Sequence, residues 1–516
     1  MKVKAAAAFS MLAVLAFMFS ACPDVDMSSF GVRPSDNVSA AAVGPVAGFG
    51  RLSVAGASFD DASAIYTDNH GRGVDNVEAG MTAVVRGSLN ASHTSGSAST
   101  VTIERELHGP AADNAAVLDA GTIHMLGRVI IVNPATVFMD SAGDDMDLER
   151  LRGFMDNGYR PSLEVYGSVQ DNGAIRASYV GCTQDNVAYG GDVELRGTVS
   201  EFDLAGRTFQ IGRQAVNYSG LPSGGRVDWP SAGLSDGMVV DVSGRLEDDG
   251  GTWVVRTNRS GDRIAVSSVD LGNVSERVAL EGYILSGAYN SFELSVPGGT
   301  VKVASDAAPS GDAFGLLRKA RVRGVLLDND GKQIRASSVL VLKALEVFLE
   351  GAPEGLPASG AAITLLGKKV KTDSYTMFRD QSGGVRDGFG LESLSPGDIV
   401  RVTGWADDDA SITAVRLDRI GGTADRVSIQ GGIASFNGSA QTSLSMLGLT
   451  VNTISDRIDY YDKGGVKLDD RDAFYKKLSV GMIVRVRNAV FVSESSRIDP
   501  PGAGERMKLE IVNVNR

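Results

Sequence analysis

Acidic side chains stand at alternate positions in one short segment, Asp328 to Gly331. Carboxylate oxygens with this spacing begin a calcium-binding loop, but a complete loop also needs a bidentate carboxylate several residues further on. Lys332 to Arg335 follow instead, and they supply no such group. Asn and Asp before Gly are equally typical of tight hairpin turns. We therefore predict a hairpin turn and no resident metal, with Asp328 and Asp330 as weak calcium candidates.

Two further acidic clusters lie elsewhere in the chain, and oxygen ligands from a single loop rarely suffice to hold calcium. Their residue types also suit turns, helix N-terminal charges and solubility, which is the interpretation we prefer. We expect calcium to leave the melting temperature unchanged, whereas a rise of several degrees over chelator would contradict this. The clusters are Asp140, Asp144, Asp145 and Asp147, and Asp469, Asp470 and Asp472.

Recurring arginines and dispersed tryptophans could each bind a glycan. The arginines could form a basic stripe for an anionic glycan or lipopolysaccharide, but outward strand positions paired with acids explain them without a ligand. The tryptophans could stack on sugars, although a stacking site needs clustered aromatics. The arginines are Arg321, Arg323, Arg401, Arg485 and Arg487, and the tryptophans are Trp229, Trp253 and Trp405.

Enzymatic chemistry has little support in the sequence. No nucleophile elbow, Walker loop, dinucleotide-binding glycine pattern or His-pair zinc motif occurs. Cys182 has none of the four histidines near it in sequence, and we predict that it is a small, buried apolar residue. Because no nucleophile, base and orienting group occur together, we expect no enzymatic activity, no cofactor and no catalytic residues.

The N-terminus has the pattern of an export signal. Lys2 and Lys4 precede a stretch of apolar character from Ala5 to Phe19, and Phe19-Ser20-Ala21-Cys22 resembles the motif that directs lipid attachment to a bacterial cysteine. A simple cleavable signal with a chance cysteine is the alternative. We predict a signal peptide over 1–21 and lipidation of Cys22. The expected location is outside the cytoplasm, anchored at the outer membrane facing the periplasm or at the cell surface.

Composition narrows the class of protein. The chain has 516 residues and a formal charge of −13, and a surface of this sign repels phosphate backbones, so we expect no nucleic-acid partner. Two cysteines exclude a disulfide scaffold. The 63 glycines and the aromatic content of 6% favour many turns between many short strands.

A repeat with a period near 80 residues organises the chain. In each copy a glycine, replaced by asparagine in the last, follows apolar residues two and four positions earlier, which predicts a strand with one buried face. These positions are Gly87, Gly167, Gly244, Gly324, Gly404 and Asn488. Polar turns rich in Asp, Asn and Gly follow most copies. The pattern predicts an all-β tandem array of about six small OB-like barrels, each of five to six strands, with short helical inserts.

The repeat divides the chain into segments. We predict a flexible tether at 22–47, because that stretch is rich in Ser, Ala, Asp, Pro and Gly. The six predicted modules follow at 48–112, 113–185, 186–265, 266–345, 346–424 and 425–516.

The modules resemble a known family. The opening Val193 to Gly197, the run Leu394 to Gly404 and the segment Gly48 to Gly56 are similar to the exported bacterial module called domain of unknown function 5666. The resemblance spans about 48–516 and implies an all-β envelope protein without an assigned activity.

These observations favour a structural or interaction protein, either a scaffold or a binding array. Its expected partners are the membrane, through Cys22, and an envelope protein or polysaccharide. A carbohydrate- or polymer-binding array is the alternative, and an envelope hydrolase is the least favoured function.

Overall fold

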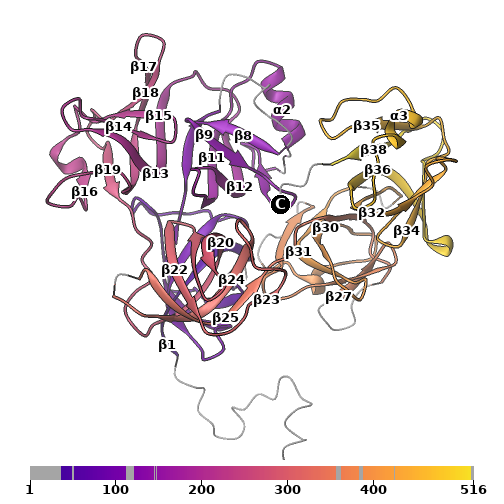
Figure 1. Ribbon diagram of the computed structural model, residues 1–516, viewed down its shortest axis with the longest axis horizontal. Helices are drawn as coiled ribbons and strands as arrows, with labels where there is room; N and C mark the ends of the chain where they lie inside the picture. Colours follow the sequence, from indigo (N-terminus) through magenta and orange to yellow (C-terminus); the bar gives the residue numbers. More distant parts are fainter. Residues whose placement is uncertain are drawn as a thin grey trace, which may run out of the picture.

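A computed structural model of the chain confirms the all-β fold class. It describes residues 37–48, 51–111, 121–144, 146, 148–329, 331–355, 362–382, 388–422 and 425–512. Within these residues the α-helices are α2 (Leu148–Asp156) and α3 (Arg471–Tyr475), and all other long elements are strands. The strands fall into six modules in chain order (Figure 1).

The first three modules span the N-terminal half. Module one contains β1 (Val38–Gly48), β2 (Leu52–Val54), β3 (Ala57–Asp60), β4 (Ile65–Asp68), β5 (Thr82–Leu89) and β6 (Ser95–Ile103). Module two contains β7 (Leu107–Pro110), β8 (Thr122–Met125), β9 (Arg128–Ile131), β10 (Val137–Met139), α2, β11 (Ser162–Val169) and β12 (Ile175–Gln184). Module three contains β13 (Gly191–Asp203), β14 (Thr208–Ile211), β15 (Gln214–Asn217), β16 (Arg226–Val227), β17 (Val239–Asp248), β18 (Trp253–Arg256) and β19 (Arg263–Val266).

The last three modules repeat the plan. Module four contains β20 (Arg277–Ala288), β21 (Ser291–Val296), β22 (Gly299–Ser305), β23 (Ser310–Gly311), β24 (Lys319–Leu326) and β25 (Gln333–Val341). Module five contains β26 (Val347–Gly351), β27 (Ala362–Leu365), β28 (Lys368–Lys371), β29 (Met377–Gln381), β30 (Ile399–Ala406) and β31 (Ile412–Ile420). Module six contains β32 (Val427–Phe436), β33 (Ser443–Met446), β34 (Leu449–Asn452), β35 (Ile458–Tyr461), α3, β36 (Ile483–Val492), β37 (Arg497–Asp499) and β38 (Met507–Ile511).

The modules share one strand order. In module one, β1 pairs with β2 and β5, β3 runs parallel to β6, and β5 pairs with β6, which closes a five-stranded ring. Equivalent pairings close rings in modules three, four and six. In modules two and five the described residues give the same order without a pairing between the first two strands, which flank 112–120 and 356–361. This is the strand order of an OB-like barrel.

Two predicted boundaries differ from the structure. The tether predicted over 22–47 is wrong at its end, because Val38–Gly48 forms β1, whose central residues are buried. Its Ala and Gly content suggested a linker, but small residues are what fit between β5 and β20, the two strands that flank β1. Module two likewise begins at β7, before the predicted residue 113. The signal peptide, Cys22 and the first part of the tether lie outside the described residues.

The repeated glycine lies within its strand rather than at the strand's end. At Gly87, Gly167, Gly324 and Gly404 the register shifts by one residue, because the partner strand has an extra residue there. This is a β-bulge, and it bends the partner strand around the barrel. A Cβ at Gly404 would lie 2.0 Å from the carbonyl oxygen of Thr413 on the partner strand. The glycine is therefore required by the close approach of two backbones.

Replacing Gly404 with alanine is expected to lower the free energy of unfolding of module five by about 2–3 kcal/mol, because the backbone must move to admit the methyl group. Gly421→Ala is the matched control, since a Cβ there meets nothing within 4 Å. Urea unfolding followed by hydrogen exchange of β30 and β31 measures the difference. Equal stability of the two variants would contradict the bulge interpretation.

The modules associate in three pairs through their opening strands. β1 runs parallel to β20, β7 is antiparallel to β13, and β26 is antiparallel to β32. Each pair therefore forms one continuous sheet, and modules one and four are joined although two modules separate them in sequence. One hydrophobic cluster spans modules two and three, and another spans five and six. The three pairs lie together in one body rather than as a string (Figure 1).

Candidate functional site

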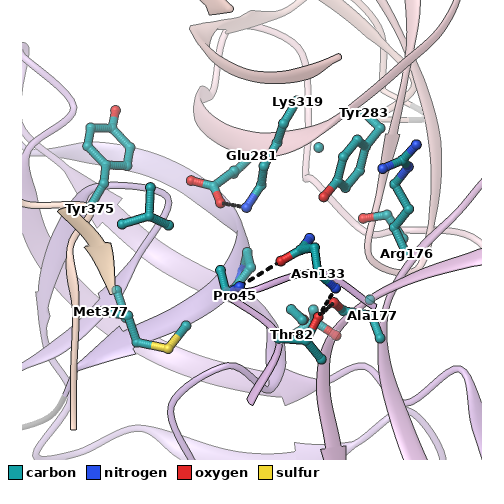
Figure 2. A pocket seen from close by; sticks show the side chains of 18 of the residues that line it. Pro45, Thr82, Asn133, Arg176, Ala177, Glu281, Tyr283, Lys319, Tyr375 and Met377 are labelled. Atoms are coloured by element: carbon teal, nitrogen blue, oxygen red, sulfur yellow. Dashed lines mark hydrogen bonds and ion pairs between the residues drawn. The ribbon is translucent and has the colours of Figure 1, made fainter. Parts of the chain in front are cut away.

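A small cavity lies where modules one, two, four and five meet. Its volume is about 60 Å³, and the side chains that line it come from all four modules (Figure 2). Module one contributes Pro45 and Thr82, and module two contributes Asn133, Arg176 and Ala177. Module four contributes Glu281, Tyr283 and Lys319, and module five contributes Tyr375 and Met377. The cavity thus marks the junction of the three module pairs.

Tyr375 of module five contacts two other modules at this junction. The Arg321 guanidinium of module four lies 3.5 Å from the centroid of its ring, within the range of a cation–π contact. On module one, the Tyr375 ring lies against Gly56, which is in the tight turn between β2 and β3. A Cβ at Gly56 would lie 2.1 Å from a ring atom, and φ there is +72°, so a side chain is excluded on both grounds.

Buried charges hold the module-four side of the junction. Glu281 on β20 pairs with Lys319, and it accepts a hydrogen bond from the Nε of Arg321 at 2.9 Å. Burial opposes ionisation of Glu281, but the two cations outweigh this effect and lower its pKa to about 2. The carboxylate therefore stays charged at neutral pH and fixes both cations, of which Arg321 lies against the Tyr375 ring.

Modules two and five are joined by direct hydrogen bonds. A guanidinium nitrogen of Arg416 donates to the carbonyl oxygen of Thr136 at 3.0 Å, and the Thr403 hydroxyl donates to the carbonyl of Pro134 at 3.4 Å. Arg416 is itself paired with Asp418 at 2.7 Å, and both side chains are buried. The turn before β10 is thus fixed against β30 and β31.

The volume of this cavity decides what it can hold. A water molecule needs about 10–15 Å³ on this measure, so the space admits a few waters. Sites for small organic ligands are about 300 Å³ or more. The junction therefore sets the relative orientation of four modules and is too small for a metabolite.

A second buried ionic cluster lies between module three and the linker that joins modules one and two. Arg196 of β13 pairs with Asp241 at 2.8 Å and with Glu104 at 2.5 Å, and it lies 3.5 Å from Glu106. Burial raises the pKa of Glu106 to about 7, even though Arg196 favours its charged form. The backbone N–H of Gly298, in module four, lies 3.5 Å from the Glu106 carboxyl, so this cluster also joins several modules.

The calcium candidates serve a turn. The Asp328 carboxylate accepts from the backbone N–H groups of Lys332 and Gln333 at 3.0 and 3.3 Å, which orders the turn between β24 and β25. Asp330 lies outside the described residues. Among the described residues, no three His, Cys, Asp or Glu side chains are grouped so as to hold a metal ion.

The other acidic clusters also have local partners. Asp140 accepts from the backbone N–H groups of Ala142 and Asp144, and it pairs with Arg150 at 2.8 Å. Asp470 caps the N-terminus of α3 by accepting from the Ala473 N–H at 2.8 Å. Asp145 and Asp147 lie outside the described residues. Turn and cap formation therefore account for Asp140 and Asp470.

The recurring arginines mostly bond to neighbouring strands. Arg401 pairs with Glu350 at 3.0 Å, and Arg485 donates to Gln430 at 2.7 Å, each across to the opening strand of the same module. Arg323 donates to the Ser92 carbonyl of module one at 3.3 Å, and Arg487 is also engaged. These side chains serve pairing within and between modules.

The tryptophans have local partners as well. The Nε1 of Trp229 donates to the Ile264 carbonyl at 2.7 Å, and that of Trp405 donates to Asp407 at 3.2 Å. Trp253 packs edge to face on Tyr189, with ring centroids 4.6 Å apart. They belong to modules three and five and do not form one shared platform.

Cys182 is buried, as predicted, and its thiol is the free one among the described residues. Burial raises its pKa to about 12, and the nearby Asp185 carboxylate adds to the effect. Because the thiolate is the reactive form, we expect iodoacetamide at pH 8 to label Cys182 only after unfolding. Mass spectrometry of the native protein measures this, and rapid native labelling would contradict it.

Sequence reasoning missed the residues that join the modules. Tyr375 and Glu106 carry no repeat signal, and Arg196 lies in the module opening Val193 to Gly197, where the repeat gives no sign of a contact with another module. One available signal was the alternation Glu104-Arg105-Glu106 in a short linker, where buried charges are unusual.

The fold and the junction define a class: a multi-module all-β protein of OB-like barrels held in one body. The sequence profile of a family described as Domain of unknown function (DUF5666) matches residues 115–181 and 354–418. The matches fall in modules two and five, as expected of tandem modules of this family, and cover a narrower span than the resemblance suggested. No curated protein matches the chain. No helix in the described residues is long and apolar enough to cross a membrane.

Proposed function

We propose that this chain is an interaction scaffold that holds six β modules in fixed positions for a partner in the cell envelope. The observation that carries the proposal is the four-module junction around Tyr375, where the contacts of its ring join modules one, four and five. A chain of independent binding modules has no need of such contacts. Fixed orientation instead suits a partner that touches several modules at once.

The anchor is part of the proposal. Lipidation of Cys22 would hold the scaffold at the outer membrane or the cell surface without a spanning helix. Mass spectrometry of the membrane fraction tests it: acyl chains on an N-terminal Cys22 are expected, and a Cys22→Ser variant is expected in the soluble fraction. An unmodified N-terminus that begins elsewhere would contradict the anchor.

The proposed role is non-enzymatic. It rests on the absence from the sequence of a nucleophile, base and orienting group in a recognisable motif. Polymer hydrolysis that a single acidic substitution abolishes would contradict it. A carbohydrate- or polymer-binding array is the second candidate function, and a cavity described below favours it.

Quantitative cross-linking in cells separates a scaffold from independent modules. The anchored protein is expected to cross-link reproducibly to one defined envelope protein, and Tyr375→Ala is expected to reduce that product at unchanged protein level. Tyr289→Ala is the matched control, because Tyr289 is half exposed on a turn of module four. Equal capture by both variants would show that the partner binds to a single module. Binding on a glycan array without any protein partner would favour the second candidate.

A further inference from the structure

A larger crevice lies between modules one and two, apart from the four-module junction. Its volume is about 380 Å³, which is within the range of small-molecule sites. Module one contributes the segment around Asp68, Arg72 and Asn76, and module two contributes β10, β11 and the end of β12. None of its lining residues belongs to the cavity of Figure 2.

Four carboxylates and two guanidinium groups line the crevice. Arg72 pairs with Asp68 through its Nε at 2.6 Å, and Arg105 pairs with Glu164 at 3.3 Å. The other two lining carboxylates are also engaged, Asp140 by Arg150 and Glu78 by a further contact. An anionic ligand would therefore meet an excess of carboxylates, and a cationic ligand would compete with existing ion pairs.

Donors and acceptors are mixed along the same wall. The Arg105 side chain lines the crevice, and its Nε is buried without a partner among the described residues. The Glu164 carboxylate accepts from the Tyr166 hydroxyl at 3.0 Å. Carboxylates accept and guanidinium groups donate, and a hydroxyl group can do both, so hydroxyl groups match such a wall.

Apolar surface completes the lining. Tyr166 and Tyr179 lie edge to face with ring centroids 5.5 Å apart, and Met81, Met139 and Ile103 also line the crevice. Polar groups form the larger part of the lining, and these apolar and aromatic side chains lie beneath them, nearly buried. The C–H face of a pyranose ring suits this apolar part, and its hydroxyl groups suit the polar part.

We propose that the crevice between modules one and two binds a neutral, hydroxyl-rich ligand of one or two sugar rings. The site is independent of the scaffold proposal, since it needs only modules one and two in contact. It would give the chain a specific carbohydrate ligand in addition to a protein partner.

Titration calorimetry on the full chain, with Cys22→Ser for solubility, tests the site. The probes are glucose, N-acetylglucosamine and their disaccharides maltose and chitobiose. We expect at least one probe to bind with a dissociation constant below about 10 mM. Inorganic phosphate and spermidine serve as anionic and cationic comparators and are expected not to bind there.

A blocking variant assigns the binding to the crevice. Gly73 lines it, its φ lies outside the left-handed region, and a Cβ there meets nothing within 4 Å, so Gly73→Leu fills space without strain. We expect Gly73→Leu to weaken sugar binding at least about tenfold. Gly502→Leu is the control, since a Cβ there is equally free and lies in module six.

Two results would overturn the proposal. One is that no sugar probe binds, whether or not phosphate or spermidine does. The other is that Gly73→Leu binds the sugar as tightly as the unaltered chain. If Gly73→Leu lowers the melting temperature, Asn76→Leu obstructs the same crevice from an exposed position and replaces it. Neither result bears on the cross-linking test of the scaffold.

Discussion

Replacing Arg196 with methionine is expected to lower the free energy of unfolding of the region around modules one to three by about 3–5 kcal/mol, the largest effect of any substitution considered. The guanidinium is almost fully buried, and it neutralises the carboxylates of Asp241 and Glu104. Methionine fills a similar volume but leaves those charges buried without a cation. Hydrogen exchange of β13 and β17 across a urea series measures the loss.

Arg497→Met provides the control for this prediction. Arg497 pairs with Asp499 at 2.7 Å, but its side chain is 46% exposed, so the pair contributes little to stability. Both variants remove a guanidinium group, which is buried at Arg196 and partly exposed at Arg497. If Arg196→Met were no less stable than Arg497→Met, the buried cluster would not hold the modules together.

The stability of this same region is expected to fall as the pH rises from 4.5 to 7. Burial raises the pKa of Glu106 from its ordinary 4.5 to about 7, so the folded state binds the proton more tightly than the unfolded state. The contribution is present in full below pH 4.5 and is lost as the pH rises through 7. For one carboxyl group this change corresponds to about 3 kcal/mol.

Glu106→Gln isolates this contribution, because glutamine stays neutral at every pH. The variant is expected to match the unaltered chain near pH 4.5 and to exceed its stability by about 3 kcal/mol at pH 8. Glu281 does not interfere, because its pKa is lowered. Its contribution to the stability of the protein is lost only as the pH falls below 4.5 toward 2. Glu494→Gln, at an exposed position, is the control. Parallel pH profiles for all three proteins would contradict the assignment.

The modules could be predicted from the sequence because each one repeats the same local residue pattern. Alternating apolar residues around Gly404 reflect one buried face, and the glycine reflects a bulge where two backbones nearly touch. Asn488 replaces the glycine at φ +53°, a conformation that asparagine tolerates. Seven residues before the repeated glycine, four copies have another glycine (Gly80, Gly237, Gly397 and Gly481). Leu317 takes this place in module four at φ +60°, where leucine is strained. Both departures were visible in the sequence.

The arrangement of the modules could not be predicted in the same way. The pairing of β1 with β20 joins residues far apart in sequence, and the alanines of β1 are equally compatible with a linker. Tyr375 lies before a strand, where an aromatic residue has many possible partners, and its contact with Arg321 exists only after three modules have met. The acidic turns attracted attention by composition, but their carboxylates bond to their own backbone. Sites between modules carry no periodic signal.

Small-angle X-ray scattering of the mature chain in solution tests the central claim that the six modules form one fixed body. A compact particle of this length has a radius of gyration of about 23 Å, and a Kratky plot with a single bell-shaped peak is expected. Tyr375→Ala is expected to increase that radius, while Tyr289→Ala leaves it unchanged. A much larger radius for the unaltered chain, with the scattering of an extended string of domains, would contradict the account.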